Sequence, residues 1–195
     1  GIRDYTGNDS LKNVNWKATA RTGNLMVNEY DESVSRNVCI LLNLEEDGVL
    51  RYDAVDEQAI SIAAGISQML IACGINVSML SNGCDVDTKS PVVINNGSGI
   101  GHLNNINTAL ARIDTGITME EYSAMLEKIF EPDNMRIESE YVYVLISASR
   151  RKKLQSVINK ISRLQADMVW IVPHFPGDDY GLELCDFEPV GWEVK

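Results

Sequence analysis

Apolar residues along this chain fall into two patterns, which are short continuous runs and longer stretches that repeat with helical spacing. The continuous runs predict strands at residues 38–42, 75–80, 91–94, 141–146 and 168–172, with one or two more within 182–194. Runs without polar interruptions are typical of strands that are buried on both faces of a sheet. The dipeptide Asn82-Gly83 predicts a turn, Pro91 is typical of an edge strand, and Pro173 is expected to end the last long strand.

The helical spacing predicts helices at residues 53–74, 102–113, 118–130 and 151–165. Asp53 or Asp56 is expected to cap the first helix, and Gly74 to end it. A glycine-rich loop at residues 96–101 precedes the second helix. Thr118 and Glu121 have the spacing of a capping box at the start of the third.

Strands that alternate with helices indicate crossover connections and a mostly parallel sheet. We therefore predict an α/β fold in which a doubly wound sheet of about six strands lies in the middle of three layers. No internal repeat and no linker divides the 195 residues, so they are expected to form a single domain.

Composition narrows the possible partners. The 17 Lys and Arg residues against 28 Asp and Glu residues give a net charge of −11, which excludes broad binding to nucleic-acid backbones. No apolar run approaches the roughly 18 residues that a membrane-spanning helix needs, so the domain itself is not expected to insert into a membrane. The four cysteines lack metal or redox spacing, which indicates reduced thiols, and Cys39 and Cys73 are expected in the core.

The first thirty residues carry an ordered pattern of charged, aromatic and glycine positions. It begins with Arg3, Asp4, Tyr5, Gly7 and Asp9, continues through Asn15, Trp16, Lys17, Ala18, Arg21 and Gly23, and ends with Leu25, Val27, Glu29 and Tyr30. This pattern resembles the signature of the bacterial family called domain of unknown function 58. The chain departs from it at Thr6, where the family has proline, and at Asn15, where it has aspartate. Trp16 and Arg21 either pack this segment onto the sheet or form a docking surface.

The resemblance implies a von Willebrand factor A-like (Rossmann-like) core over residues 37–195, with residues 1–36 as an N-terminal extension. Members of the family are often encoded beside MoxR-type AAA+ ATPases, and many carry transmembrane helices before this domain. The chain is therefore expected to be the cytoplasmic C-terminal piece of a membrane protein, with a MoxR-type ATPase as a possible protein partner.

Many von Willebrand factor A-like domains hold a divalent cation at the carboxyl ends of the central strands, on an Asp-x-Ser-x-Ser motif, a threonine and a further aspartate. In this chain the motif positions fall on Asn43, Glu45 and Asp47. Ser98 is the candidate for the threonine, and Ser149 follows the strand where the last aspartate is absent. The resemblance thus implies a degenerate metal site and no cofactor, with Mg²⁺ or Mn²⁺ as the alternative.

A basic cluster, Arg150 to Lys153, lies at the start of the last predicted helix. Cations at a helix N-terminus oppose the helix dipole, so an acidic partner is expected. In the implied topology the acids Glu45, Glu46 and Asp47 lie nearby. We therefore hypothesise that the side-chain cations replace the charge of the missing metal.

These observations predict a non-enzymatic protein-interaction domain. A metal-dependent adhesion-type module that uses Mg²⁺ or Mn²⁺ on the same face is the alternative, and a hydrolase is the least favoured. The loop 96–101 lacks the spacing and position of a dinucleotide fingerprint. His174 follows a predicted strand, but no nucleophile accompanies it.

Overall fold

The chain folds as two units, Gly1–Val34 and Ser35–Lys195. The computed structural model describes residues 2–4, 6, 16–28, 37–45, 52–130, 141–163 and 167–194. Several predicted site and signature residues lie outside this range, among them Tyr5, Gly7, Asp9, Glu46 and Asp47. Within the described residues, no helix combines the length and apolarity that crossing a membrane requires.

In the first unit, β1 (Ile2–Asp4) pairs antiparallel with β2 (Met26–Asn28), and α1 (Trp16–Thr22) lies between them in sequence. Thr19 joins the helix to the strand, because its hydroxyl accepts a bond from the Met26 N–H at 3.0 Å. Its carbonyl accepts from the Gly23 N–H, also at 3.0 Å. Gly23 has a φ of 75°, so this signature glycine ends α1 in the left-handed conformation that glycine adopts without strain.

In the second unit, the described residues form a seven-stranded sheet with the order β5-β4-β3-β7-β8-β9, and β6 pairs with β4. The strands are β3 (Asn37–Asn43), β4 (Asn76–Asp85), β5 (Pro91–Gly97), β6 (Ile113–Thr118), β7 (Tyr141–Ser147), β8 (Asp167–His174) and β9 (Val190–Glu193). The pairs β4–β3, β3–β7, β7–β8 and β8–β9 are parallel. Strands β5 and β6 run antiparallel to β4. The fold is therefore α/β, and the sheet is mixed but mostly parallel.

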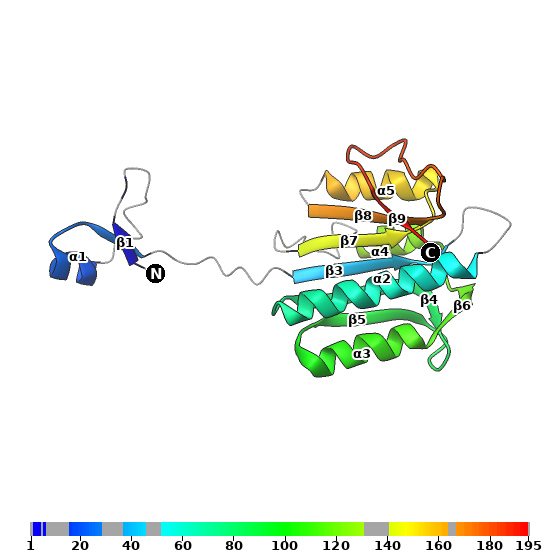
Figure 1. Cartoon of the computed structure of the whole chain (residues 1–195), viewed down its shortest axis with the longest axis horizontal. Helices are drawn as coiled ribbons and strands as arrows, with labels where there is room; N and C mark the ends of the chain where they lie inside the picture. Colours follow the sequence, from blue (N-terminus) through cyan, green and yellow to red (C-terminus); the bar gives the residue numbers. More distant parts are fainter. Residues whose placement is uncertain are drawn as a thin grey trace. The chain divides into compact units, whose positions relative to one another are not determined.

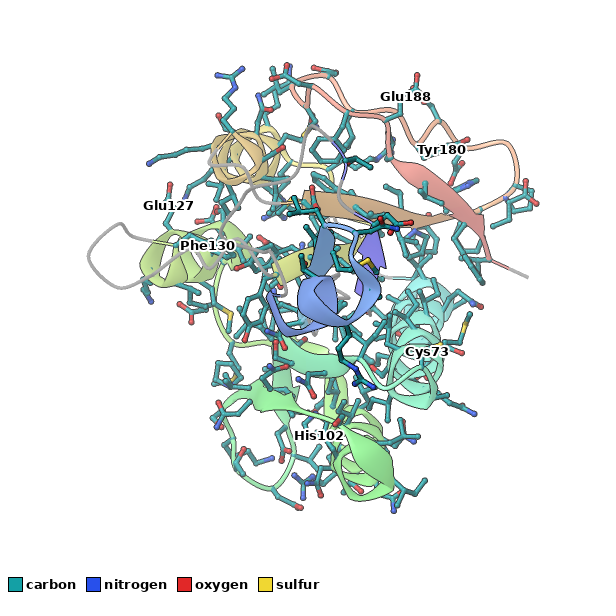
Figure 2. All side chains as sticks on the ribbon, turned by 90° about the vertical axis from the view of Figure 1, so that its left-hand side faces the viewer. Cys73, His102, Glu127, Phe130, Tyr180 and Glu188 are labelled. Carbon is teal, nitrogen blue, oxygen red and sulfur yellow. The ribbon has the colours of Figure 1, made fainter. Side chains whose placement is uncertain are left out.

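Helices cover both faces of this sheet. The helices are α2 (Asp53–Ala72), α3 (Gly99–Ala111), α4 (Tyr122–Ile129) and α5 (Lys152–Ser162). Residues of α2 and α3 pack with Ile40 and Leu42 in one core, and residues of α4 and α5 pack with Leu41 and Trp170 in another. Figure 1 shows α2 and α3 on the near side of the sheet, and Figure 2 shows the two helix layers on opposite sides of it.

Two predicted turns or ends lie inside strands. Asn82-Gly83 does not turn the chain, because β4 continues through it to Asp85. A Cβ atom on Gly83 would lie 2.8 Å from the Ile113 side chain and 2.9 Å from that of Leu44, so the glycine permits close approach. Pro173 likewise lies within β8. The β7–β8 ladder ends at Ile171, so the proline interrupts no bond of that pair.

The glycine-rich stretch at residues 96–101 is not an open loop. Gly97 ends β5, Ser98 precedes α3, and the helix begins at Gly99 rather than at residue 102. A Cβ atom on Gly97 would lie 2.8 Å from Nδ1 of His102, whose Nε2 lies 2.7 Å from the carbonyl oxygen of Val77. Gly97 therefore lets the histidine reach the neighbouring strand, which gives both residues a structural role.

The helix starts also differ from expectation. Thr118 belongs to β6 and pairs with Gly83, so the predicted capping box does not form. Tyr52 precedes α2, and Asp53 and Asp56 lie in its first turn rather than capping it. Gly74 ends α2 as predicted, with a φ of 75°.

The cysteines occupy different environments. All four are free thiols. Burial raises the pKa of Cys39 to about 11. Cys73, which was expected in the core, is exposed because it lies just after the last turn of α2.

Candidate functional site

The carboxyl ends of three neighbouring strands bring polar residues together at one edge of the sheet. Asn43 ends β3, and its register partner in the parallel strand β7 is Ser147. On the other side of β3, Leu42 pairs with Ser81 of β4, so Asn82 lies beside Asn43. We call Asn43, Asn82, Ser147 and Ser149 the strand-end network.

Hydrogen bonds connect this network across all three strands. The Asn43 Nδ2 donates to the Ser147 hydroxyl at 2.9 Å, and Ser147 donates to the carbonyl oxygen of Ser149 at 2.9 Å. The Asn43 Oδ1 accepts from the Asn82 side chain and from the Glu45 N–H, each at 2.9 Å. All four residues of the network are at most 2% exposed. These bonds replace the water that buried amides and hydroxyls lose on folding.

Asn82 is the member that sequence reasoning missed. Its Oδ1 accepts from the Leu44 N–H at 2.9 Å, just where the chain leaves β3. The residue is fully buried, because β4 continues through it instead of turning there. The apolar run at residues 75–80 was the available signal, because the strand that it forms continues through residue 82.

Glu45 projects from the end of β3 toward the starts of two helices. Its Oε2 accepts from the N–H of Tyr122, the first residue of α4, at 3.3 Å. Its Oε1 contacts the guanidinium of Arg151, the residue before α5. No acid lies in the first turn of either helix. Glu45 therefore supplies the negative charge that the positive end of the α4 dipole favours.

The basic cluster is distributed over several acceptors. Arg150 donates to the carbonyl oxygen of Asp179, and Arg151 contacts Glu45. Lys152 lies 2.8 Å from Glu183, and Lys153 lies 2.7 Å from Glu121. The start of α5, which carries cations against its dipole, thus has acidic partners from the residues after β3, from the turn before α4 and from the segment after β8.

The pKa shifts agree with these pairings. The hydrogen bond from Lys153 holds the pKa of the Glu121 carboxyl below its usual range, and the same bond raises the pKa of Lys153. The bond to Glu183 raises the pKa of Lys152 in the same way. The Glu121–Lys153 pair therefore stays charged over a wider pH range than its members would alone.

Ser98 does not join the network. Because β5 runs antiparallel to β4, Gly97 pairs with Val77 near the amino end of β4. Ser98 follows directly and so lies at the opposite edge of the sheet from Asn43. The resemblance implied Ser98 as the threonine-like ligand, and the antiparallel direction of β5 separates it from the other expected ligands.

The described donors do not fit the expected cation site. The Asn43 oxygen already accepts two N–H groups, and Glu45 contacts a guanidinium. In the part of the chain that the structure describes, no group of three or more His, Cys, Asp or Glu side chains is placed to hold a metal ion. Of the expected ligands that the structure describes at this edge, Glu45 is the one carboxylate, and its oxygens already contact the Tyr122 N–H and the Arg151 guanidinium.

His174, the candidate for a hydrolase, is held by its neighbours. Its Nδ1 lies 2.9 Å from the carbonyl oxygen of Phe175, and its ring stacks on Tyr180 with centroids 4.5 Å apart. These contacts fix the ring at the end of β8. Of the signature residues, Arg21 is exposed, while the side chains of Arg3, Trp16 and Lys17 lie outside the described set.

Comparisons with known proteins give a family but no activity. The sequence model of the family described as "Protein of unknown function DUF58" matches residues 1–161. No curated protein matches the chain. The crystal form 2 structure of proximal thread matrix protein 1 from the mussel byssus matches 70% of this chain and 37% of its own, at 7% identity and a TM-score of 0.47. Another structure of the same protein matches 71% and 37%, at the same identity and TM-score.

Proposed function

The chain belongs to the DUF58 family, a family of unknown function, and we propose that its second unit is a non-enzymatic protein-interaction domain. The partner docks on the edge formed by the ends of β3, β4 and β7. The finer fold that we propose is von Willebrand factor A-like, with a degenerate metal site at that edge. A MoxR-type AAA+ ATPase on the cytoplasmic side of a membrane is the proposed partner.

The contact between Arg151 and Glu45 carries this proposal. In a metal-dependent module, a cation at the strand ends captures a carboxylate of the partner. Here the guanidinium of Arg151, whose side chain is 45% exposed, lies beside the expected ligand Glu45, which is 13% exposed. A guanidinium presents a planar fork of donors that matches a carboxylate, so Arg151 can bind a partner's acid without a metal.

The strand-end network supports the same reading. Its buried amides and hydroxyls are bonded to one another, so they hold the edge rigid rather than offering free ligands. A rigid edge keeps Glu45 and Arg151 in a fixed geometry, which favours selective docking.

Calorimetric titration of the whole chain with Mg²⁺ and Mn²⁺ tests the metal-free part of the proposal. We expect no binding in the micromolar range. Micromolar binding that is lost in Glu45→Gln would overturn it and favour the metal-dependent adhesion-type module.

The docking part is tested with a purified MoxR-type ATPase and ATP. Arg151→Met is expected to weaken binding at least tenfold, whereas Lys160→Met, which removes an exposed cation from the last turn of α5, should leave it unchanged. Equal effects of both variants, or no binding by the unaltered chain, contradict the docking proposal. Turnover in an esterase and phosphatase screen that His174→Ala abolishes would instead indicate a hydrolase.

A further inference from the structure

One stretch of sheet on the α2 side carries exposed apolar side chains. Val169 and Ile171 lie two residues apart and so share one face of β8. The register pairs Ile171 with Val190 and Pro173 with Trp192 of β9. Paired residues of parallel strands point to the same face, so Val169, Val190 and Trp192 share the face on which α2 packs. They are 38%, 50% and 45% exposed. We call these three residues the β8–β9 patch.

The two faces of these strands differ in cover. On the far face, α5 packs against Trp170 and Val172 of β8, both at most 1% exposed. On the near face, Ile171 of β8 packs in the core that α2 covers and is 8% exposed, and Figure 1 draws no helix of the second unit in front of the rest of the strand. In Figure 2 the helix layer on the right likewise does not reach the level of Tyr180 and Glu188. Among the described residues of the second unit, the helix layer on this face therefore stops short of Val169, Val190 and Trp192.

The size of the uncovered strip indicates what fits it. Neighbouring strands lie about 4.8 Å apart, so two strands present a strip about 10 Å wide. A helix with its side chains has a diameter of about 10–12 Å. One amphipathic helix, laid beside α2, would complete the layer and cover the β8–β9 patch.

The charge around the strip selects the kind of helix. The elements that frame it, α2, β7, β8 and β9, contain no lysine or arginine. The exposed acid Asp167 lies two residues before Val169 on the same face of β8, and α2 contributes the exposed acid Glu57. A second copy of this chain would bring the same acids into opposition, and an anionic lipid surface would be repelled by them.

We propose that the β8–β9 patch docks a cationic amphipathic helix of a partner protein. Its apolar stripe packs on Val169, Val190 and Trp192, and its Lys and Arg side chains face the acids of the rim. The indole of Trp192 also offers its ring face to a cation, which strengthens such contacts. This surface is separate from the strand-end network, so the proposal does not depend on the docking function assigned to Arg151.

A labelled 18-residue peptide of leucine and lysine in amphipathic helical order is the probe, and fluorescence anisotropy with the whole chain is the measurement. There are two control peptides. One has the same composition in scrambled order, and the other has glutamate in place of every lysine. We expect the amphipathic cationic peptide to bind at least tenfold more tightly than either control. Equal binding of the scrambled peptide would show attraction to net charge alone and would overturn the proposal.

Variants locate the binding. Trp192→Ser is expected to weaken peptide binding at least fivefold. Val169→Lys should also weaken it, because the new lysine repels the lysines of the peptide. Ile100→Ser is the matched control, because Ile100 is an exposed apolar residue of α3, 74% exposed. Arg151→Met should leave peptide binding unchanged, which separates this proposal from the previous one. If circular dichroism shows that Trp192→Ser unfolds the chain, Val190→Ser takes its place.

Three outcomes contradict the proposal. Equal weakening by Ile100→Ser would place the peptide elsewhere. Binding to phosphatidylglycerol vesicles that Trp192→Ser abolishes would identify a lipid surface as the occupant. Self-association in sedimentation experiments that Trp192→Ser abolishes would identify a second copy.

Discussion

Replacing Asn82 by alanine removes the residue that joins the ends of β3 and β4. Three bonds are lost: Oδ1 no longer accepts from the Leu44 N–H, and Nδ2 no longer donates to the Asn43 oxygen or, at 3.5 Å, to the carbonyl oxygen of Glu120. Leu44 is 2% exposed, so water cannot replace the lost acceptor. An unsatisfied buried donor costs about 1–3 kcal/mol, and the second bond contributes about 0.5–1.5 kcal/mol. We therefore expect Asn82→Ala to lower the free energy of unfolding by about 2–4 kcal/mol.

Urea denaturation followed by tryptophan fluorescence measures this change. Trp170 reports directly on the region, because its indole N–H donates to the carbonyl oxygen of Ser147 at 3.1 Å. Asn96→Ala is the matched control. Asn96 is exposed and donates one bond to Asn37 at 2.8 Å, so its loss should change stability by less than about 0.5 kcal/mol.

The reasoning is refuted if Asn82→Ala costs less than about 1 kcal/mol, or no more than Asn96→Ala. Either result would mean that the strand-end network is not held by its buried amides. An unchanged slope of the urea transition is also required, since a changed slope would indicate an altered unfolded state.

Further predictions concern glycines, an acid and a thiol. Gly83→Ala should destabilise the chain by about 1–3 kcal/mol through overpacking, whereas Gly65→Ala, inside α2 with open space around its Cβ position, should stabilise it by about 0.5–1 kcal/mol in the same urea assay. The Thr88 N–H, with further donors, holds the pKa of Asp85 below its usual range. Its carboxylate therefore stabilises the fold above about pH 4 and loses this effect as the pH falls further. Asp85→Asn should flatten the acid limb of melting temperature against pH, and an unchanged limb would contradict the assignment. Alkylation of the native chain at pH 8 should modify Cys73 first, as mass spectrometry would show, and earlier labelling of a buried thiol would disprove its placement.

Local patterns were sufficient for most elements of the second unit. The strands at 38–42, 141–146 and 168–172 were predicted because continuous apolar runs suit the two-sided burial of a central strand. The stripe of α5 was predicted for the same kind of reason, since Leu154, Val157, Ile158 and Ile161 face one core. Strand β6 was missed, because its residues 113–118 mix polar and small side chains and are held by pairing with β4.

The candidate site was predicted in part. Glu45 and Arg151 were expected to lie close together, because the ends of neighbouring parallel strands share one edge, and the structure brings them into contact. Asn82 and Ser98 were misplaced for related reasons. The position of Asn82 depends on whether β4 continues through Gly83, and that of Ser98 depends on the direction of the edge strand β5. Neither feature is encoded in the neighbouring residues.

The amino-acid sequence by itself determined the alternation of strands and helices, the family, and the residue types available at the strand ends. Tertiary structure alone decided which of them meet. Asn43 bonds to residues 39 and 104 positions away, and such pairs depend on strand order and register. It also decided that Ile171 is buried whereas Val169 of the same strand is exposed, because a side chain is exposed or buried according to what packs over it. An apolar run indicates that a strand can be covered on both faces, and only the packed fold shows whether it is.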